Sequence, residues 1–253
     1  IALMQSCFEE NEVKSFIRDY GMVIVDECHH VSAVNFERIL KYSTACYVYG
    51  LTATPIRKDG HQPIIFMQCG PIRYSADVKM QMASQTFERL LIPRFTSYRE
   101  LTDDKKTYAQ IIQGMSNDTY RNTLIIDDVC KALEDGRSPI VLTNLTSHVE
   151  ALATILAPKC KNVITLVGSE SVKEKRMKME RLQTVPQTAP ILIIATGKYV
   201  GEGFDYPRLD TLFLALPISW KGIVVQYAGR LHREYPGKKD VRIYDYIDIH
   251  LPL

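Results

Sequence analysis

Short apolar runs bounded by turn residues alternate along the chain with amphipathic stretches. Near-continuous apolar runs are typical of strands that are buried on both faces of a parallel sheet. They predict strands at residues 22–25, 46–51, 140–142, 163–167, 191–195, 212–216 and 241–246. The amphipathic stretches predict helices at 35–41, 119–134, 147–156, 172–184 and 223–232, the third and fourth opened by serine caps. The alternation predicts repeated βαβ units, hence an α/β fold with parallel sheets.

The periodic pattern lapses into polar and mixed sequence around residues 84–91. We place a boundary between two lobes there, with residues 1–86 in the first lobe and 87–253 in the second. The second has strand and helix material for a complete α/β unit, whereas the first has only a few strands. The first four residues, Ile1–Met4, have the apolar character of a buried strand. We therefore expect the first lobe to be truncated at its N-terminus and the chain to be a fragment.

Charge, cysteine content and the lengths of the apolar runs narrow the class of protein. The chain has 31 Lys and Arg against 29 Asp and Glu, so local patches, not net charge, would hold a polyanion. The six cysteines include no C-x-x-C pair, which argues against a zinc ribbon or a disulfide framework and favours a reducing cytoplasm. No apolar run approaches the roughly 20 residues that cross a bilayer, and no signal peptide opens the chain.

The strongest local signal is a pair of carboxylates, Asp26 and Glu27, directly after the predicted strand at 22–25. Ligand sites of open α/β sheets form at the carboxyl ends of strands. In a phosphoryl-transfer interpretation, Asp26 holds Mg²⁺ through its water shell, Glu27 polarises the attacking water and His29 senses the nucleotide. In the alternative interpretation, the two carboxylates only cap the following helix.

Two more segments carry candidate groups. Thr52 and Thr54 follow an apolar strand, and their hydroxyls could bridge the carboxylate loop to another element. Gln226, Arg230 and Arg233 have spacings of four and three, which predicts that they share one helical face. Two guanidiniums that point together fit an anion such as phosphate. An ordinary strand end and a surface salt bridge are the alternative interpretations of these segments.

A glycine-bearing loop at 197–205 follows the predicted strand at 191–195, and such a loop lets a ligand approach the backbone closely. Gly197-Lys198 is not a P-loop, because no Ser or Thr follows, the first glycine is missing and we expect no helix to begin there. The Gly-Lys pair at 237–238 fails the same test.

Taken in order, Asp-Glu-Cys-His at 26–29, Leu-Thr-Ala-Thr-Pro at 51–55, the loop at 201–205 and the segment 226–233 resemble motifs II, III, V and VI of superfamily 2 helicases. Met-Gln-Ser at 4–6 is similar to the nucleic-acid-contacting motif that precedes motif II. The resemblance spans nearly the whole chain. The individual boxes resemble those of restriction-enzyme translocating subunits and XPB-type repair helicases more than those of D-E-A-D RNA helicases, which favours DNA.

The resemblance implies two RecA-like lobes of the P-loop NTPase type, with ATP and Mg²⁺ in the cleft between them. The implied catalytic and nucleotide-binding residues are Asp26, Glu27, His29, Gly203, Asp205, Gln226, Arg230 and Arg233, with Asp26 as the Mg²⁺ ligand through water. Thr52 and Thr54 would couple the lobes. Nucleic acid, expected to be double-stranded DNA, would be gripped mainly through its phosphates. The implied contacts are Gln5, Ser6, Asn144, Thr196 and Lys198.

Several alternatives stay open at this stage. Asn144 could belong to motif IV or be a helix-capping loop residue, and Gly168-Ser169 could begin a contact loop or a cap. Motif I and the adenine-reading motif are not found in the chain, so we expect this fragment to hydrolyse ATP poorly or not at all. The parent would be an ATP-dependent DNA helicase or translocase; the alternatives are a nucleic-acid-binding module without ATP turnover and a motor that serves a fused or associated nuclease.

Overall fold

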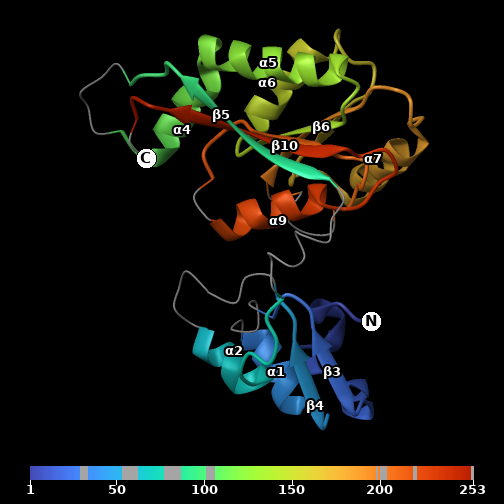
Figure 1. The fold of residues 1–253 in the computed structure, drawn as a ribbon. Helices are drawn as coiled ribbons and strands as arrows, with labels where there is room; N and C mark the ends of the chain where they lie inside the picture. Colours follow the sequence, from blue (N-terminus) through green and yellow to red (C-terminus); the bar gives the residue numbers. More distant parts are fainter. Residues whose placement is uncertain are drawn as a thin grey trace. The chain divides into compact units, whose positions relative to one another are not determined.

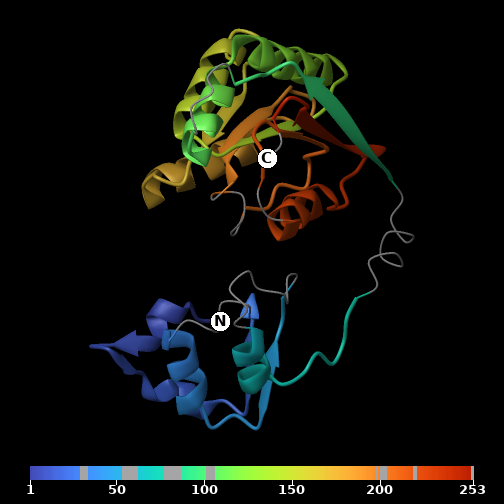
Figure 2. The same cartoon turned by 90° about the vertical axis from the view of Figure 1, so that its left-hand side faces the viewer.

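The computed structural model describes residues 1–28, 34–52, 62–76, 87–100, 106–197, 199, 204–218 and 221–251. The chain divides into two compact units, residues 1–84 (unit 1) and 85–253 (unit 2). Each unit is drawn in Figure 1 and, turned about the vertical axis, in Figure 2. Among the described residues, no helix has the length and apolar character needed to span a bilayer.

Unit 1 contains a β-hairpin and a pair of parallel strands. Its elements are η1 (Met4–Cys7), β1 (Phe8–Glu9), β2 (Glu12–Val13), η2 (Ser15–Asp19), β3 (Met22–Val25), α1 (Val34–Tyr42), β4 (Tyr47–Gly50) and α2 (Gln62–Cys69). Strands β3 and β4 are parallel, with Met22 opposite Tyr47 and Val25 opposite Gly50. The strand expected at Ile1–Met4 is wrong, because Met4 begins the 3-10 helix η1 and the side chains of Ile1 and Leu3 are exposed.

The two faces of the β3–β4 pair differ sharply. One face packs on α1 and α2, where Val25, Leu40 and Ile65 form a small core. The opposite face presents four large apolar side chains to solvent, each about half exposed or more: Met22, Ile24, Tyr47 and Tyr49. Parallel sheets are ordinarily covered on both faces, so this exposed apolar face of unit 1 stands out.

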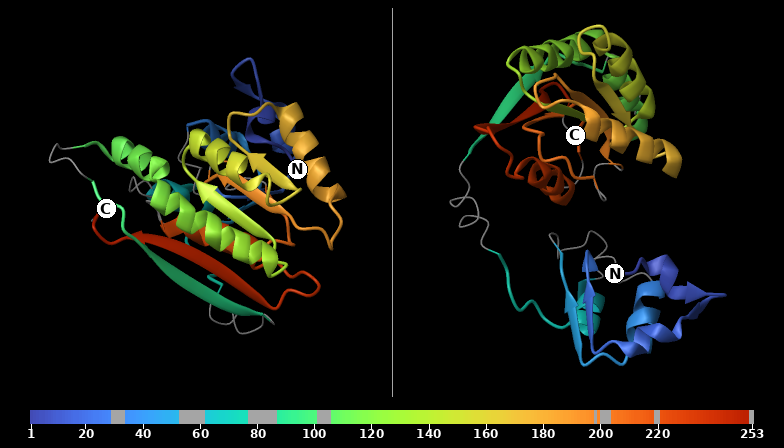
Figure 3. Two further views of the ribbon diagram at one scale, coloured as in Figure 1. Left: turned by 90° about the horizontal axis from the view of Figure 1, so that it is seen from above. Right: turned by 90° about the vertical axis from the view of Figure 1, so that its right-hand side faces the viewer.

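Unit 2 contains a parallel sheet. Its described elements are β5 (Glu88–Thr96), α4 (Tyr108–Asn117), α5 (Thr119–Glu134), β6 (Pro139–Thr143), α6 (Thr146–Leu156), β7 (Val163–Leu166), α7 (Val172–Thr184), β8 (Leu192–Thr196), β9 (Thr211–Leu214), α9 (Lys221–Leu231) and β10 (Asp240–Asp248). Six strands of the described part pair in the order β5-β10-β9-β6-β8-β7, and every pair is parallel. The view from above in Figure 3 shows the strands side by side.

Helices cover both faces of this sheet (Figures 1 and 2). On one face, α5 and α6 pack on Val141, Ile194 and Phe213, and on the other, α7 and α9 pack on side chains such as Ile193 and Leu212. Residues 193 and 194 are neighbours on β8 and point to opposite faces, as the pleat requires. The central strands are therefore buried on both sides, which explains why β6, β8 and β9 are apolar almost throughout.

The other strands and helices predicted from the sequence are confirmed, with small shifts at their ends. The two predicted serine N-caps have different outcomes. Ser171 caps α7 in a reciprocal capping box with Glu174, as the sequence suggests. The serine cap expected for α6 is wrong, because Ser147 lies inside the first turn and the N-cap is Leu145. His148, the next residue, is buried and its ring bonds hold that turn in place of a cap.

Candidate functional site

The carboxylate pair lies in a tight turn at the carboxyl end of β3. Glu27 has a left-handed backbone conformation with φ of 47°, which costs a non-glycine residue about 1–3 kcal/mol. Its N–H donates to Asp26 Oδ1 at 3.0 Å. Asp26 is exposed and Glu27 is half-buried. Strain of this kind clusters at active sites and ligand clamps, and among the described residues Glu27 shares it with Glu10 and Asn11 of the β1–β2 hairpin turn.

Backbone hydrogen bonds continue the pairing of β3 and β4 past the ends of both strands. The N–H of Leu51 donates to Val25 O at 2.9 Å, and the N–H of Cys28 donates to Leu51 O at 2.9 Å. Thr52 directly follows Leu51, so these bonds hold it near the carboxylate turn, and its side chain is half-buried. Two predicted residues of this region, His29 and Thr54, lie outside the described residues.

Close packing beneath the turn requires glycine at position 50. A Cβ on Gly50 would lie 2.8 Å from Cys28 Sγ and 3.1 Å from Cys69 Cβ. Burial, helped by the neighbouring Cys69, raises the pKa of Cys28 to about 11, so its thiol is neutral near pH 7. Cys28 thus anchors one side of the turn in the core, whereas Asp26 is exposed and Glu27 is half-buried.

In unit 2, Thr196 is the last residue of β8 and its side chain is buried. Its Oγ1 accepts the N–H of Gly168 at 3.3 Å, which joins the ends of β7 and β8. The loop expected directly after β8 is wrong in part, since the described residues Gly197 and Tyr199 are helical. Two predicted residues of this segment, Lys198 and Gly203, lie outside the described part of the chain.

The segment after β8 contacts α9 through a residue that sequence reasoning passed over. A Cβ on Gly197 would lie 2.2 Å from the Tyr227 hydroxyl, so glycine leaves the space for that ring. Tyr227 is buried, and burial raises its pKa to about 12. The available signal was its place beside Gln226 in the predicted helix. The side chain of Gln226 itself is not among those described.

Arginines mark the end of α9, but not in the expected way. Arg230 lies in the last turn and is half-buried, whereas the helix ends at Leu231, so Arg233 lies beyond it. The expectation that Arg233 shares a helical face with Arg230 is therefore wrong. Instead, Arg233 Nε lies 3.5 Å from Asp205 Oδ1. Both side chains are about half exposed, so the pair adds little stability, but it brings two predicted motifs together.

Three of the predicted nucleic-acid contacts, Gln5, Ser6 and Asn144, lie at exposed positions. Asn144 Nδ2 donates to Pro217 O at 3.0 Å, and Asn144 is not the N-cap of α6, so the capping interpretation is wrong. Gln5 and Ser6 are exposed on η1, where Ser6 Oγ donates to Leu3 O at 2.6 Å. Ser169 is exposed in the loop before α7, and it is not the cap of that helix.

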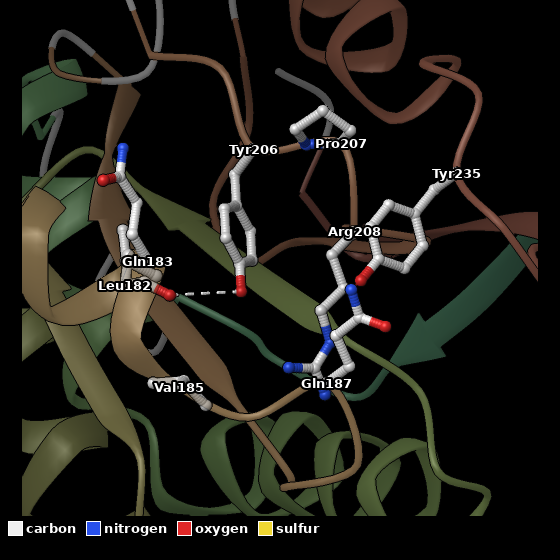
Figure 4. Close-up of a pocket in the computed structure, with 8 residues that line it drawn as sticks. All are labelled: Leu182, Gln183, Val185, Gln187, Tyr206, Pro207, Arg208 and Tyr235. Carbon is white, nitrogen blue, oxygen red and sulfur yellow. Dashed lines mark hydrogen bonds between the residues drawn. The ribbon is translucent and has the colours of Figure 1, made fainter.

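A cavity of about 140 Å³ lies between the end of α7 and the segment after Asp205 (Figure 4). The Tyr206 hydroxyl donates to Leu182 O at 3.4 Å, and Arg208 donates to Pro186 O at 3.1 Å and Ala189 O at 2.5 Å. Tyr206 and Arg208 in the cavity wall thus donate their hydrogen bonds to backbone oxygens of the protein itself. The lining residues are Leu182, Gln183, Val185, Gln187, Tyr206, Pro207, Arg208 and Tyr235.

Six parallel strands covered by helices on both faces give unit 2 the architecture of a RecA-like helicase lobe. Residues 1–57 match the family described as "Type III restriction enzyme, res subunit". The chain is 26% identical to "Putative helicase 161L" of Invertebrate iridescent virus 6, over 93% of this chain and 53% of that protein. It is 25% identical to "Probable helicase D10" of Escherichia phage T5, over 90% and 49%.

Solved structures agree in fold. A fragment of a putative HsdR subunit of a type I restriction enzyme from Vibrio vulnificus YJ016 has a TM-score of 0.67 at 22% identity, covering 89% of this chain and 43% of that one. T4 UvsW has a TM-score of 0.50 at 21% identity, covering 94% and 47%. The chain is therefore similar in sequence to these helicases over most of its length, and its first 57 residues match the restriction-enzyme family. It spans about half the length of the curated relatives it matches.

Proposed function

We propose that the full-length protein is an ATP-dependent helicase or translocase and that this chain supplies part of its motor. Unit 1 is the C-terminal part of a first RecA-like lobe and unit 2 is the second lobe. The observation that carries the proposal is the turn at Asp26 and Glu27, because it combines a carboxylate pair, the carboxyl end of a parallel strand and a strained backbone.

Asp26 is the proposed Mg²⁺ ligand and Glu27 the residue that orients the attacking water. Asp26 is exposed, and only Oδ1 accepts the neighbouring N–H in the bonds described above, so oxygens remain for a hard cation or its water shell. No cluster of three or more potential metal ligands occurs in the part of the chain that the structure describes. Mg²⁺ is ordinarily held by one or two carboxylates together with substrate phosphates and waters.

Asp205, Arg230 and Arg233 are the proposed contribution of unit 2. ATP supplies the phosphoryl group, and arginine forks match its oxygens bidentately. An arginine that neutralises charge in a phosphoryl-transfer transition state is worth about 10³ to 10⁵ in kcat in related enzymes. The Arg233–Asp205 pair is exposed and weak, so a phosphate group can replace the carboxylate as partner. Gln226, His29, Gly203, Thr52 and Thr54 keep the roles that the motif resemblance implies.

The P-loop of this motor lies in another part of the full-length protein. The exposed apolar face of β3 and β4 supports this, because further βα units of the first lobe would cover it. We therefore expect the chain alone to hydrolyse ATP poorly.

Double-stranded DNA is the proposed partner, in line with the restriction-enzyme family match. The proposed phosphate contacts are Gln5, Ser6, Asn144, Thr196 and Lys198. Of these residues, Thr196 has the least structural support as a phosphate contact, because it is buried and its hydroxyl oxygen already accepts the N–H of Gly168.

The test is the ATPase activity of the full-length protein with and without duplex DNA, compared with this chain alone. Glu27→Gln keeps the shape of the side chain but removes the base, and Glu9→Gln is a matched control because Glu9 is exposed on the β1 strand. We expect DNA-stimulated hydrolysis only in the full-length protein, a loss of kcat of at least 100-fold in Glu27→Gln, and no change in Glu9→Gln. An inert full-length protein, or a fully active Glu27→Gln variant, refutes the proposed function.

A further inference from the structure

A tight turn follows α9 and presents one lysine to the core side of unit 2. The N–H of Lys238 donates to Tyr235 O at 3.1 Å, and Gly237 has φ of 84°. A type II turn requires a positive φ at its third position and commonly has proline at its second, and residues 235–238 have both. The Gly-Lys pair here therefore serves a turn, and the lysine side chain is placed by it.

The Lys238 ammonium group donates to three backbone carbonyls. Nζ lies 2.7 Å from Pro207 O, 2.8 Å from Leu231 O and 2.7 Å from Arg233 O. An ammonium group has three N–H donors and no acceptor, so this set uses its whole capacity. All three distances are in the range of strong charge-assisted bonds.

These carbonyls belong to the two segments that carry the proposed nucleotide contacts. Leu231 is the last residue of α9, so its carbonyl has no partner inside the helix, and a positive charge is favourable at this end. Arg233 follows the helix, and Pro207 comes two residues after Asp205. Lys238 thus ties the end of the arginine segment to the aspartate segment, alongside the exposed Arg233–Asp205 pair.

The surroundings hold the lysine in place. The buried ring of Phe87 has its centroid 5.9 Å from Lys238 Nζ, and the same ring lies 6.1 Å from the ring of His232. Pro207 also lines the cavity of Figure 4, next to Tyr235 from the same turn. The lysine is half-buried, in contrast to its exposed neighbour Lys239.

We propose that Lys238 is a positioning residue that fixes Arg233 and Asp205 relative to each other for the transition state of ATP hydrolysis. The inference rests on the proposed function and deepens it. Lys238 does not touch the nucleotide; it acts through the backbone of Arg233 and of the segment after Asp205. Its removal frees both segments without deleting either charged group.

The test uses Lys238→Met in the full-length protein, because Met has similar length and no donor, with Lys239→Met as the matched control. ATPase is measured at pH 7, below the value of about 8 to which burial lowers the Lys238 pKa. We expect Lys238→Met to lower kcat at least tenfold while KM for ATP changes less than threefold, and Lys239→Met to leave both unchanged. Lys238→Gln, which keeps a shorter donor group, should lose less.

A double-mutant cycle separates positioning from simple loss of structure. In an Arg233→Ala background, single-turnover hydrolysis should be slow, and adding Lys238→Met should lower it less than twofold further, because one of the two groups that the lysine holds relative to each other is already absent. A further tenfold loss in that background, or wild-type kcat in Lys238→Met, overturns the inference. If Lys238→Met does not fold, the same cycle with Lys238→Gln decides. If Arg233→Ala and Glu27→Gln are both fully active, the proposed function itself has failed.

Discussion

The most informative stability test concerns a buried ion pair at the carboxyl end of the sheet in unit 2. Arg121 of α5 is 1% exposed, and Asp248 ends β10 at 8%. Arg121 Nε lies 3.0 Å from Asp248 Oδ1 and Nη2 lies 3.4 Å from Oδ2. Nη1 donates to the backbone oxygen of Ala215, and the Thr96 hydroxyl donates to the same carboxylate. The pair therefore connects α5 with three neighbouring strand ends.

Removing one partner leaves the other charge buried without compensation. For a pair this deep the loss is about 3–5 kcal/mol, against about 5–15 kcal/mol for the whole stability of a domain. We expect this loss in both Arg121→Met and Asp248→Leu. The double variant replaces both charges by apolar groups and should lose less than the sum of the single losses, by about 1–3 kcal/mol.

Urea unfolding of the chain, with hydrogen exchange on peptides from α5 and β10 to assign the transition to unit 2, measures these losses. The exposed pair of Arg176 and Glu180 on α7 offers a control, since Glu180→Gln should change stability by less than about 0.5 kcal/mol. Single losses below about 1 kcal/mol, or a double loss equal to the sum, refute the reasoning. Either result would mean that the buried Arg121 and Asp248 are not energetically coupled.

Three further predictions concern unit stability. Burial lowers the pKa of His148 to about 4; the unfolded chain binds this proton near pH 6.5, so unit 2 should lose up to about 3 kcal/mol as pH falls from 6.5 to 4. Urea titrations should show this slope reduced in His148→Gln, and an equal slope contradicts it. Gly50→Ala should destabilise unit 1 by about 1–3 kcal/mol through overlap with Cys28. Adding Cys28→Ala should recover part of that loss, and thermal unfolding that shows no recovery argues against the packing account. Ser171→Ala should cost about 1 kcal/mol through loss of the α7 cap; Ser169→Ala, if equally costly in the same unfolding assay, would point to another cause.

Much of the fold of unit 2 is predictable from the sequence because its strands are buried on both faces. Helix α5 has the predicted bounds of 119–134, and β6, β7, β8, β9 and β10 lie within a few residues of the predicted strands. Helix α2 was missed because its run of apolar residues has almost no polar face. Helix α4 was missed although Thr107 and Gln110 form a capping box that the sequence displays. The order of the strands in the sheet could not be predicted, because hydrophobic periodicity indicates which face of a strand is buried but not which strands lie beside it.

The candidate site was predictable in its positions and less so in its geometry. The carboxylate turn follows its strand as expected, but nothing in the residue types foretells the left-handed conformation of Glu27. Arg233 was placed on a helix face by spacing, although α9 ends before it. Lys238 was passed over because its acceptors are backbone carbonyls, which every residue has and which therefore leave no trace in the sequence.

The pairing of β5 with β10 has a consequence for biosynthesis. These are the first and last strands of unit 2, and Thr96 and Asp248 at their ends are 152 positions apart. At about 5–20 residues per second of synthesis, β5 waits roughly 8–30 s for its partner strand. Leu91 and Phe95 on β5 are exposed even in the folded structure, so the nascent chain presents an unpaired, aggregation-prone strand throughout that interval. Ribosome-associated chaperones are therefore expected to matter more for this unit than its size suggests.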